Sequence, residues 1–340
     1  MSSLAQEKSA AKPRVPRLGF LGVGWIGRNR MEALAGLGKI EIAAIADPRL
    51  EEMPADTLPA GAARCPHLEA LFEQNLDGVV IATPSALHAA QSIAALQAGL
   101  AVFCQKPLGR TAAEVRQVIA AARQADRLLA VDLSYRHLAG MRQIRQLIQA
   151  GEIGKIFAVD LIFHNACGPD KAWYYEASQS GGGCVMDLGV HLVDLVLWAL
   201  GYPRVAHVSS RIFAKGSCLR PPITEVEDYA AARIEFEDGA MANLACSWRL
   251  PAGRDAIIEA SFYGTRGGLS LTNINGSFSD FQAYHYQGTS KIMLNDGPEK
   301  WQAGAVAEWA NLLAVNPHFN PSIEALVPVA EILDAIYYRP

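Results

Sequence analysis

The feature that most constrains this chain is the glycine-rich turn Gly22-Val23-Gly24-Trp25-Ile26-Gly27, which directly follows a short apolar run at 17–21. A helical pattern begins after the turn. In such a turn the first glycine allows the tight bend, the second lets the backbone approach a pyrophosphate, and the third lets helix and strand pack closely. The helix N-terminus then faces the negative charge. The order strand, turn, helix therefore predicts a dinucleotide-binding site that includes Gly22, Gly24, Trp25, Ile26 and Gly27.

A second apolar run, 40–46, ends in Asp47, at the separation from the turn that is typical of an acid binding the adenosine ribose. Its carboxylate would accept hydrogen bonds from free ribose hydroxyls and repel a 2'-phosphate, which favours NAD. Arg49, two residues later, could instead accommodate that phosphate. We expect Asp47 and Arg49 to contact the cofactor, with NAD as the cofactor and NADP as the alternative.

Strand and helix patterns alternate from residue 17 to about 135. Further strands are expected at 77–82, 100–104 and 127–133, and helices at 86–98 and 111–125. This alternation predicts an α/β fold with a parallel, doubly wound sheet, in other words a Rossmann domain. Ligands bind beyond the carboxyl ends of such strands. Thr83-Pro84 and Lys106-Pro107 fall at those ends.

The pattern changes after residue 135. Helices are expected at 138–150, 183–200, 303–315 and 323–338, and strands at 155–164, 204–213, 228–236, 241–249 and 256–263. Consecutive strands joined by short turns imply an open-faced, largely antiparallel sheet in an α+β domain, with helices on one face and a second subunit on the other. We divide the chain into a disordered leader at 1–16, a dinucleotide-binding domain at 17–135, and a substrate-binding and oligomerisation domain at 136–340.

Composition narrows the partners. The chain of 340 residues is 51% hydrophobic, enough for two domains with their own cores. A net charge of -4 without basic blocks argues against nucleic acid and against an anionic membrane as partners. Without a signal-peptide core or an apolar run of membrane length, we expect a cytoplasmic protein. The six cysteines have no metal-ligand or redox spacing, so we predict reduced packing residues and no bound metal.

Two segments carry candidate chemistry. Gln105-Lys106-Pro107 ends the run 100–104 and places an ammonium where the nicotinamide should lie. Further on, Asp187, His191 and Asp194 are spaced i, i+4 and i+7 in an apolar helical segment that follows Gly181-Gly182-Gly183. The polar stripe could be a buried hydrogen-bonded pair that fixes the helix, a metal site, or an acid/base histidine whose tautomer a carboxylate sets. No second HxxxH supports the metal site.

At this point the sequence resembles the Gfo/Idh/MocA oxidoreductases, which act on sugars and cyclitols. Four motifs match in order: the glycine turn, Thr83-Pro84-Ser85 with His88, Lys106-Pro107, and the glycine run followed by Asp187 and His191. The resemblance implies a Rossmann domain followed by an open-faced sheet domain, NAD or NADP as cofactor, and homodimers or homotetramers formed through that sheet. It also implies that Lys106, Asp187 and His191 are the catalytic set, and that a cis peptide bond precedes Pro107.

The sequence departs from that family at two positions. Gln105 stands where glutamate is usual, which removes a negative charge beside Lys106 and the nicotinamide ribose. Ser134 stands where an asparagine is common. We still expect Gln105 in the cofactor site, because an amide keeps much of the shape and hydrogen-bond reach of a carboxylate.

Other polar residues are weaker candidates. Arg136 could contact the cofactor or substrate, with an interdomain ion pair as the alternative, and His88 would support the loop near the cofactor. Trp173 could stack on a sugar face or lie at an interface. The polar loop that begins at His164 could cover the site. We therefore place Thr83, Pro84, His88 and Arg136 with the cofactor, and His164 and Trp173 with the substrate.

The chemistry expected is hydride transfer between a nicotinamide and a secondary alcohol or ketone of a sugar, a sugar acid or a cyclitol. His191 would exchange the hydroxyl proton, Lys106 would stabilise charge on the same oxygen, and Asp187 would orient the set and contact another hydroxyl. Some relatives use the lysine as the acid/base instead. Two alternatives remain: an NAD-dependent glycosidase of the same family, and a catalytically silent dinucleotide-binding sugar sensor.

Overall fold

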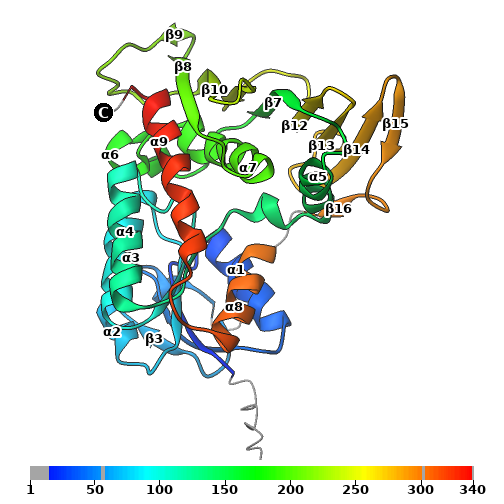
Figure 1. Cartoon of the computed structure of the whole chain (residues 1–340). Helices are drawn as coiled ribbons and strands as arrows, with labels where there is room; N and C mark the ends of the chain where they lie inside the picture. The colour runs from blue at the N-terminus through cyan, green and yellow to red at the C-terminus, as the bar shows by residue number, and fades with distance from the viewer. Residues whose placement is uncertain (1–14, 55–57, 301–302, 339–340) are drawn as a thin grey trace, which may run out of the picture.

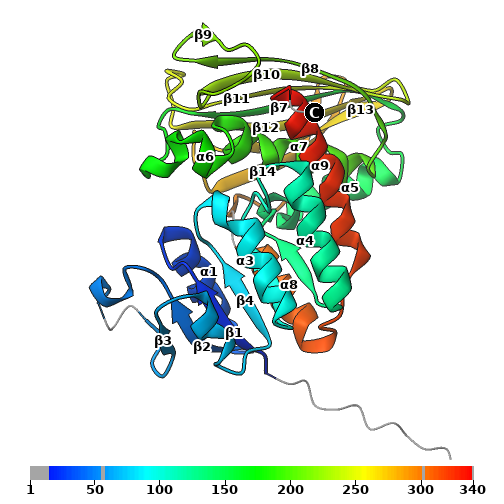
Figure 2. The same cartoon turned by 90° about the vertical axis from the view of Figure 1, so that its left-hand side faces the viewer.

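The computed structural model describes residues 15–54, 58–300 and 303–338. Two layered regions lie one above the other, each built around its own sheet (Figures 1 and 2). Of the leader expected at 1–16, residues 1–14 lie outside the described residues.

The first region is a parallel sheet in the order β3-β2-β1-β4-β5-β6, which confirms the predicted doubly wound architecture. Its strands are β1 (Arg17–Leu21), β2 (Glu41–Ala46), β3 (Ala63–Cys65), β4 (Gly78–Ile81), β5 (Ala101–Cys104) and β6 (Leu129–Val131). Its helices are α1 (Trp25–Gly36), α2 (Leu68–Phe72), α3 (Ser85–Gln97) and α4 (Ala112–Ala125). The sequence analysis missed β3 and α2, because three and five residues are too short for a periodic pattern.

Burial explains why these strands are continuous apolar runs. Every residue of β4 and of β5 is buried, as expected for a parallel sheet that is covered by helices on both faces. Helix α4 has ordinary capping signals at both ends. At the start of α4, Thr111 Oγ1 accepts a hydrogen bond from Glu114 N at 3.2 Å, and Asp126 ends the helix in a left-handed conformation.

The second region is a ten-stranded sheet in the order β15-β14-β13-β12-β7-β11-β10-β8-β9, with β16 paired to β14. All pairs are antiparallel except β7 with β11, which confirms the largely antiparallel sheet. The strands are β7 (Ile156–Asn165), β8 (Val205–Ala214), β9 (Ser217–Cys218), β10 (Tyr229–Phe236), β11 (Met241–Ser247), β12 (Ala256–Gly264), β13 (Gly267–Asn273), β14 (Asp280–Gln287), β15 (Ser290–Met293) and β16 (Glu299–Lys300). The four strands after β12 were not predicted.

Within the described ranges, helices cover only one face of this sheet. α5 (Ala139–Gln149), α6 (Ala177–Ser180) and α7 (Val190–Leu200) lie between the sheet and the Rossmann region, and the opposite face has no element drawn over it (Figure 2). The alternating burial along β10 agrees with a sheet that has one packed and one uncovered face. Short single-turn helices connect the layers: η1 (Leu50–Glu52), η3 (Ser134–His137), η4 (Ala172–Tyr175), η5 (Val185–Gly189) and η6 (Pro321–Ala325).

One helical stretch is longer and more apolar than the sequence analysis expected. Ala177–Leu200 spans 24 residues with a mean hydropathy of 1.7, which by length and composition alone would suffice to cross a membrane. In the folded chain, however, 83% of its most apolar window is buried inside the protein. The stretch comprises α6, η5 and α7, and its apolar part belongs to the core of the second region.

The C-terminus returns to the first region. α8 (Gly304–Val315) was assigned to the second domain, but it packs beside α1, and the Trp309 ring lies 5.6 Å from the Phe103 ring of β5. α9 (Leu326–Ile336) runs along both regions and contacts α4 and α7 (Figure 1). The periodicity of α8 predicts a helix, but it carries no information about which core the helix joins.

Candidate active site

The glycine turn has the shape that a dinucleotide requires. Gly22 has φ +84°, and its N–H donates to Ala46 O at 2.8 Å, which ties the turn to the end of β2. A Cβ at Gly27 would lie 2.1 Å from Gly22 O, so only glycine allows this contact between helix and strand. A Cβ at Gly24 would meet nothing within 4 Å. The backbone at Gly24 therefore faces open space at the start of α1, where a pyrophosphate fits.

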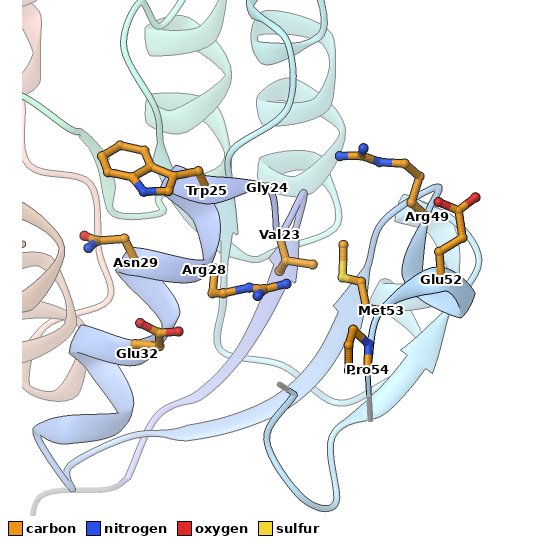
Figure 3. A pocket seen from close by; sticks show the side chains of 10 residues that line it. All are labelled: Val23, Gly24, Trp25, Arg28, Asn29, Glu32, Arg49, Glu52, Met53 and Pro54. Carbon is orange, nitrogen blue, oxygen red and sulfur yellow. The ribbon is translucent and has the colours of Figure 1, made fainter. Parts of the chain in front are cut away.

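A hollow of about 480 Å³ lies beside this turn, between α1 and the segment that follows β2 (Figure 3). Arg28, Asn29 and Glu32 line it from α1, and Arg49 and Glu52 from the other side. Trp25, at the start of α1, is 75% exposed. The adenosine half of a dinucleotide fits a cleft in this position, at the carboxyl end of β2.

Asp47 connects the two walls of that hollow. Its Oδ2 accepts a hydrogen bond from Val23 N and its Oδ1 from Arg49 N, both at 2.9 Å. Each carboxylate oxygen retains a further acceptor site for a ribose hydroxyl. Arg49 is exposed beside it, so the structure brings together the two residues that we placed at the ribose.

His88 joins the loops that contain Thr83-Pro84 and Lys106-Pro107. Its side chain is 1% exposed, with Nδ1 2.7 Å from Pro107 O and Nε2 2.7 Å from Thr83 O. Burial lowers the pKa of this imidazole. Both ring nitrogens face backbone carbonyls, and the neutral ring donates to one of them, so His88 lies buried between the two loops with a hydrogen bond to one. The Thr83 hydroxyl in turn donates to Gln91 Oε1 at 2.6 Å.

Lys106 and Asp187 meet where the two regions face each other. Lys106 Nζ lies 2.6 Å from both Asp187 Oδ1 and the Asp187 backbone oxygen. The other carboxylate oxygen, Oδ2, accepts a hydrogen bond from Trp248 Nε1 at 3.0 Å. The Lys106 and Asp187 side chains are 17% and 16% exposed, so the pair is partly shielded but reachable. The peptide bond before Pro107 is cis, as expected.

His191 lies beside this pair without the carboxylate partner that we expected. It is 7% exposed, its ring packs edge-on against Tyr135 at 4.9 Å, and its Nδ1 has no hydrogen-bond partner among the described residues. Burial, together with the charges of Lys106 and Arg30, lowers the pKa of the imidazole well below its usual value. At neutral pH the ring is therefore an uncharged base.

The local helix geometry explains the missing partner. Val185–Gly189 is a π-helical turn, whose wider winding takes Asp187 and His191 out of the i, i+4 alignment of an α-helix. Asp187 is occupied by Lys106 and Trp248. Asp194 is occupied by Arg136. Among the described residues no three His, Cys, Asp or Glu side chains gather as metal ligands would.

Arg136 forms an ion pair, which was the alternative to a contact with the cofactor or substrate. Its guanidinium binds both carboxylate oxygens of Asp194, which is 1% exposed, and lies over the rings of Trp198 and Tyr202. The structure thus shows Arg136 joining η3 to α7. A direct contact with the cofactor would have to use guanidinium hydrogens that this pair leaves available.

The two residues proposed for the substrate lie on different surfaces. Trp173 stacks on Tyr174 with the ring centres 3.8 Å apart, and Tyr174 in turn meets Trp248 edge-on at 6.1 Å. This places Trp173 in an aromatic cluster that reaches Asp187 through Trp248. His164 instead bonds Ser247 Oγ through Nδ1 at 2.8 Å and stacks on Tyr229, and burial lowers its pKa.

Three residues of this region were not predicted from the sequence: Arg30, Asp132 and Trp248. Gln105 Nε2 donates a hydrogen bond to Asp132 Oδ2. The same oxygen accepts a hydrogen bond from Arg30 Nε at 2.6 Å. Two signals were available. Asp132 directly follows a strand at its carboxyl end, and Arg30 occupies a position on the buried face of α1, where a charge needs a partner.

Comparison with known proteins agrees with this geometry. Residues 16–133 match the family model described as "Oxidoreductase family, NAD-binding Rossmann fold", and residues 141–270 match the GFO/IDH/MocA C-terminal domain. A curated relative, the D-glucoside 3-dehydrogenase of Escherichia coli (strain K12), is 27% identical over 277 residues, covering 78% of this chain and 79% of its own length.

Solved structures share the whole fold. GenD2 from gentamicin A biosynthesis, in complex with NAD, superposes with a TM-score of 0.78 at 24% identity, covering 99% of this chain and 97% of its own. KijD10, a 3-ketoreductase from Actinomadura kijaniata in complex with NADP, superposes with a TM-score of 0.81 at 21% identity. The match covers 96% of this chain and 98% of KijD10. At these identities the likeness establishes the fold.

Proposed function

Because this chain belongs to the Gfo/Idh/MocA family of NAD(P)-dependent oxidoreductases, we propose that it transfers a hydride between the nicotinamide and a secondary alcohol or ketone of a sugar, a sugar acid or a cyclitol. The observation that carries this proposal is the contact of Lys106 with Asp187, beside a neutral His191 whose Nδ1 has no hydrogen-bond partner among the described residues. Hydride transfer from an alcohol needs a base for the hydroxyl proton and a donor for the developing alkoxide.

Each residue has a distinct task in alcohol oxidation. A bound oxidised nicotinamide supplies the hydride acceptor. His191 accepts the hydroxyl proton, since its lowered pKa keeps the imidazole unprotonated at neutral pH. Lys106 donates a hydrogen bond to the same oxygen and stabilises its negative charge. In ketone reduction the same two groups act in reverse.

Asp187 positions Lys106 and is itself positioned. The Lys106 ammonium contacts two oxygens of Asp187, and the Trp248 indole fixes the remaining one. Both carboxylate oxygens keep acceptor sites for a neighbouring hydroxyl of a polyol. A substrate with hydroxyls on adjacent carbons therefore suits this arrangement.

The aromatic cluster of Trp173, Tyr174 and Trp248 supports a carbohydrate ring as the substrate. The cluster ends in the indole N–H that donates to Asp187. Aromatic faces pack against the apolar C–H surface of a sugar, while polar groups bind its hydroxyls. We place the substrate between this cluster and Lys106.

We propose NAD as the preferred cofactor. The Asp47 carboxylate is held at the end of β2 by two backbone N–H groups, and its negative charge opposes a 2'-phosphate. Arg28 and Arg49 in the same hollow are the residues through which NADP would bind.

We also propose a homodimer or homotetramer, formed through the uncovered face of the ten-stranded sheet. A shallow hollow of about 670 Å³ on this sheet is lined by residues of β7, β8, β10, β11 and β12, among them Arg211, Arg233 and Glu259. Light scattering after size exclusion tests the assembly, and a monomer at micromolar concentration contradicts it. A cytoplasmic location stays a prediction from the sequence.

A substrate screen tests the function. Purified protein is incubated with NAD or NADP and a panel of aldoses, sugar acids, polyols and inositols, with Lys106→Met as the inactive control. Growth of NADH absorbance that depends on Lys106 is expected. Release of phenol from aryl glycosides without net NADH would identify a glycosidase instead. Tight NADH binding with no turnover on any substrate would identify a sensor.

A further inference from the structure

A buried polar network underlies the residue that precedes the catalytic lysine. Asp132 Oδ2 accepts hydrogen bonds from Arg30 Nε, at 2.6 Å, and from the Gln105 amide Nε2. Asp132 Oδ1 accepts a hydrogen bond from the Ser134 hydroxyl. Arg30 also reaches Ser134 Oγ at 3.3 Å. Exposure is 0% for Arg30, 2% for Asp132, 6% for Gln105 and 2% for Ser134.

The network connects three elements that form the cofactor cleft. Arg30 comes from α1, directly after the glycine turn, Gln105 ends β5, and Asp132 and Ser134 follow β6. Gln105 and Ser134 both donate to the same carboxylate, so a change at either residue alters the hydrogen bonds of Asp132.

Charge balance explains why residue 105 is an amide. The Asp132 carboxylate is compensated by one guanidinium, and a buried charge is tolerated only when it is paired. A glutamate at position 105 would place a second carboxylate within hydrogen-bond distance of the first, where only one of the two could readily ionise. Gln105 instead supplies a donor.

We propose that Asp132 and Arg30 are positioning residues for Gln105 and Lys106: their ion pair anchors the Gln105 amide through its nitrogen, which requires a neutral side chain before the lysine. A carboxylate accepts only from the amide nitrogen, so the amide has a single orientation. The Gln105 Oε1 atom accepts no hydrogen bond from the described residues, so it keeps an acceptor site that a bound cofactor can use.

The network also acts on the catalytic base. Arg30 lies near enough for its charge to be among those that lower the pKa of His191. Asp132 balances that charge at a salt-bridge distance. Loss of the Asp132 carboxylate would therefore disturb the segment that carries Lys106. It would also change the electrostatic potential at His191.

A double-mutant cycle between positions 105 and 132 tests the proposal. The variants are Gln105→Glu, Asp132→Asn and the double variant, in which one carboxylate and one amide remain but exchange places. Thermal unfolding and NADH binding by calorimetry are measured for each. Gln117→Glu, an exposed glutamine of α4, is the matched charge control and should behave as the wild type.

We expect Gln105→Glu to lower the unfolding temperature and to weaken NADH binding about tenfold, because two facing carboxyl groups cannot both ionise readily and the amide donor to Asp132 is lost. The double variant should regain most of both losses. Effects of the two single changes that simply add would overturn the proposal, because additivity means that the side chains do not interact.

The cycle remains informative if Gln105→Glu fails to fold by itself. In that case the double variant is compared with Asp132→Asn alone, and the addition of Gln105→Glu to the Asp132→Asn variant should raise the unfolding temperature. A further decrease would overturn the proposal. The inference rests on the proposed function only for the site of NADH binding. Wild-type protein that binds no NADH would refute that function, whereas the unfolding data still decide the coupling.

Discussion

The two halves of the candidate active site are built in different ways. In the cofactor half, the glycine turn and Asp47 are held by backbone contacts that are close in sequence, such as Val23 N to Asp47 Oδ2 at a separation of 24 residues. In the catalytic half, Lys106 meets Asp187 at a separation of 81 residues, and Trp248 reaches Asp187 from 61 residues further along the chain.

This difference shows where each half is vulnerable. The geometry of the turn requires residues that can adopt a tight bend. The cofactor half therefore depends on individual positions that have no room for a side chain. The catalytic half depends on side chains that two cores bring together, so it depends on charge and on hydrogen-bond partners. Changes in the catalytic half should therefore affect turnover while leaving cofactor binding almost unchanged.

Lys106→Met should show the largest effect. The change removes the ammonium that binds Asp187 and that we propose to bind the reacting oxygen, and we expect kcat to fall by about 10⁴-fold. NADH affinity, measured by calorimetry, should stay within about threefold of the wild type if the two halves are energetically separate. Lys155→Met, at an exposed position, is the control. Turnover near the wild-type level would leave Lys106 with a structural role only.

His191→Asn should lower kcat by about 10³-fold, again with NADH binding nearly intact. The wild-type rate of alcohol oxidation should fall as pH decreases, with an apparent pKa below the usual histidine value, because the buried imidazole resists protonation. The variant should lack this acidic limb. A pH profile that is the same in both proteins would assign the proton transfer to another group, with Lys106 as the first alternative.

Two glycine variants separate folding from binding in the cofactor half. Gly27→Ala places a methyl 2.1 Å from Gly22 O and should lower the free energy of unfolding, by about 3 kcal/mol. Gly24→Ala meets no atom within 4 Å and should unfold like the wild type, yet bind NADH about tenfold more weakly because the methyl occupies the pyrophosphate position. Equal losses of stability in the two variants would contradict this distinction.

Trp248→Phe should have the smallest effect. It removes the indole hydrogen bond to Asp187 but keeps an aromatic ring in the cluster, and one such bond contributes about 1 kcal/mol. We expect kcat/KM to fall about fivefold, with unfolding temperature and NADH affinity maintained. Trp198→Phe, an indole outside the cluster, is the comparison. A change in NADH affinity but not in kcat/KM would mean that the two halves are not separate.

Much of the fold could be predicted from the sequence. The parallel sheet and its cofactor turn followed from local periodicity and glycine spacing, and all strand pairs of the observed sheet are parallel. The short strand β3, the strands after β12 and the placement of α8 were not found. β3 is too short for a periodic pattern, and the pattern of α8 is equally consistent with either core. β13 and β14 have seven and eight residues, so length does not explain why they were missed.

The candidate catalytic residues could be named from the sequence, but their partners could not. The expected Asp–His alignment on one α-helical face assumed the regular α-helical repeat, and the π-helical turn at Val185–Gly189 changes that winding. Trp248 carries no sequence signal beyond its place at the end of a strand. Arg30 and Asp132 lie 102 residues apart, and nothing in either local sequence shows that they pair.

The sequence by itself determined the dinucleotide turn, the acid at the end of β2, and the presence of a lysine, an aspartate and a histidine with the spacing of an oxidoreductase. These features depend on the conformations available to a few consecutive residues. The tertiary structure decided which partner each charge has: Asp187 binds Lys106, Asp194 binds Arg136, and Asp132 binds Arg30. Burial makes an unpaired charge costly, and only the packing of two cores determines which opposite charge lies within reach.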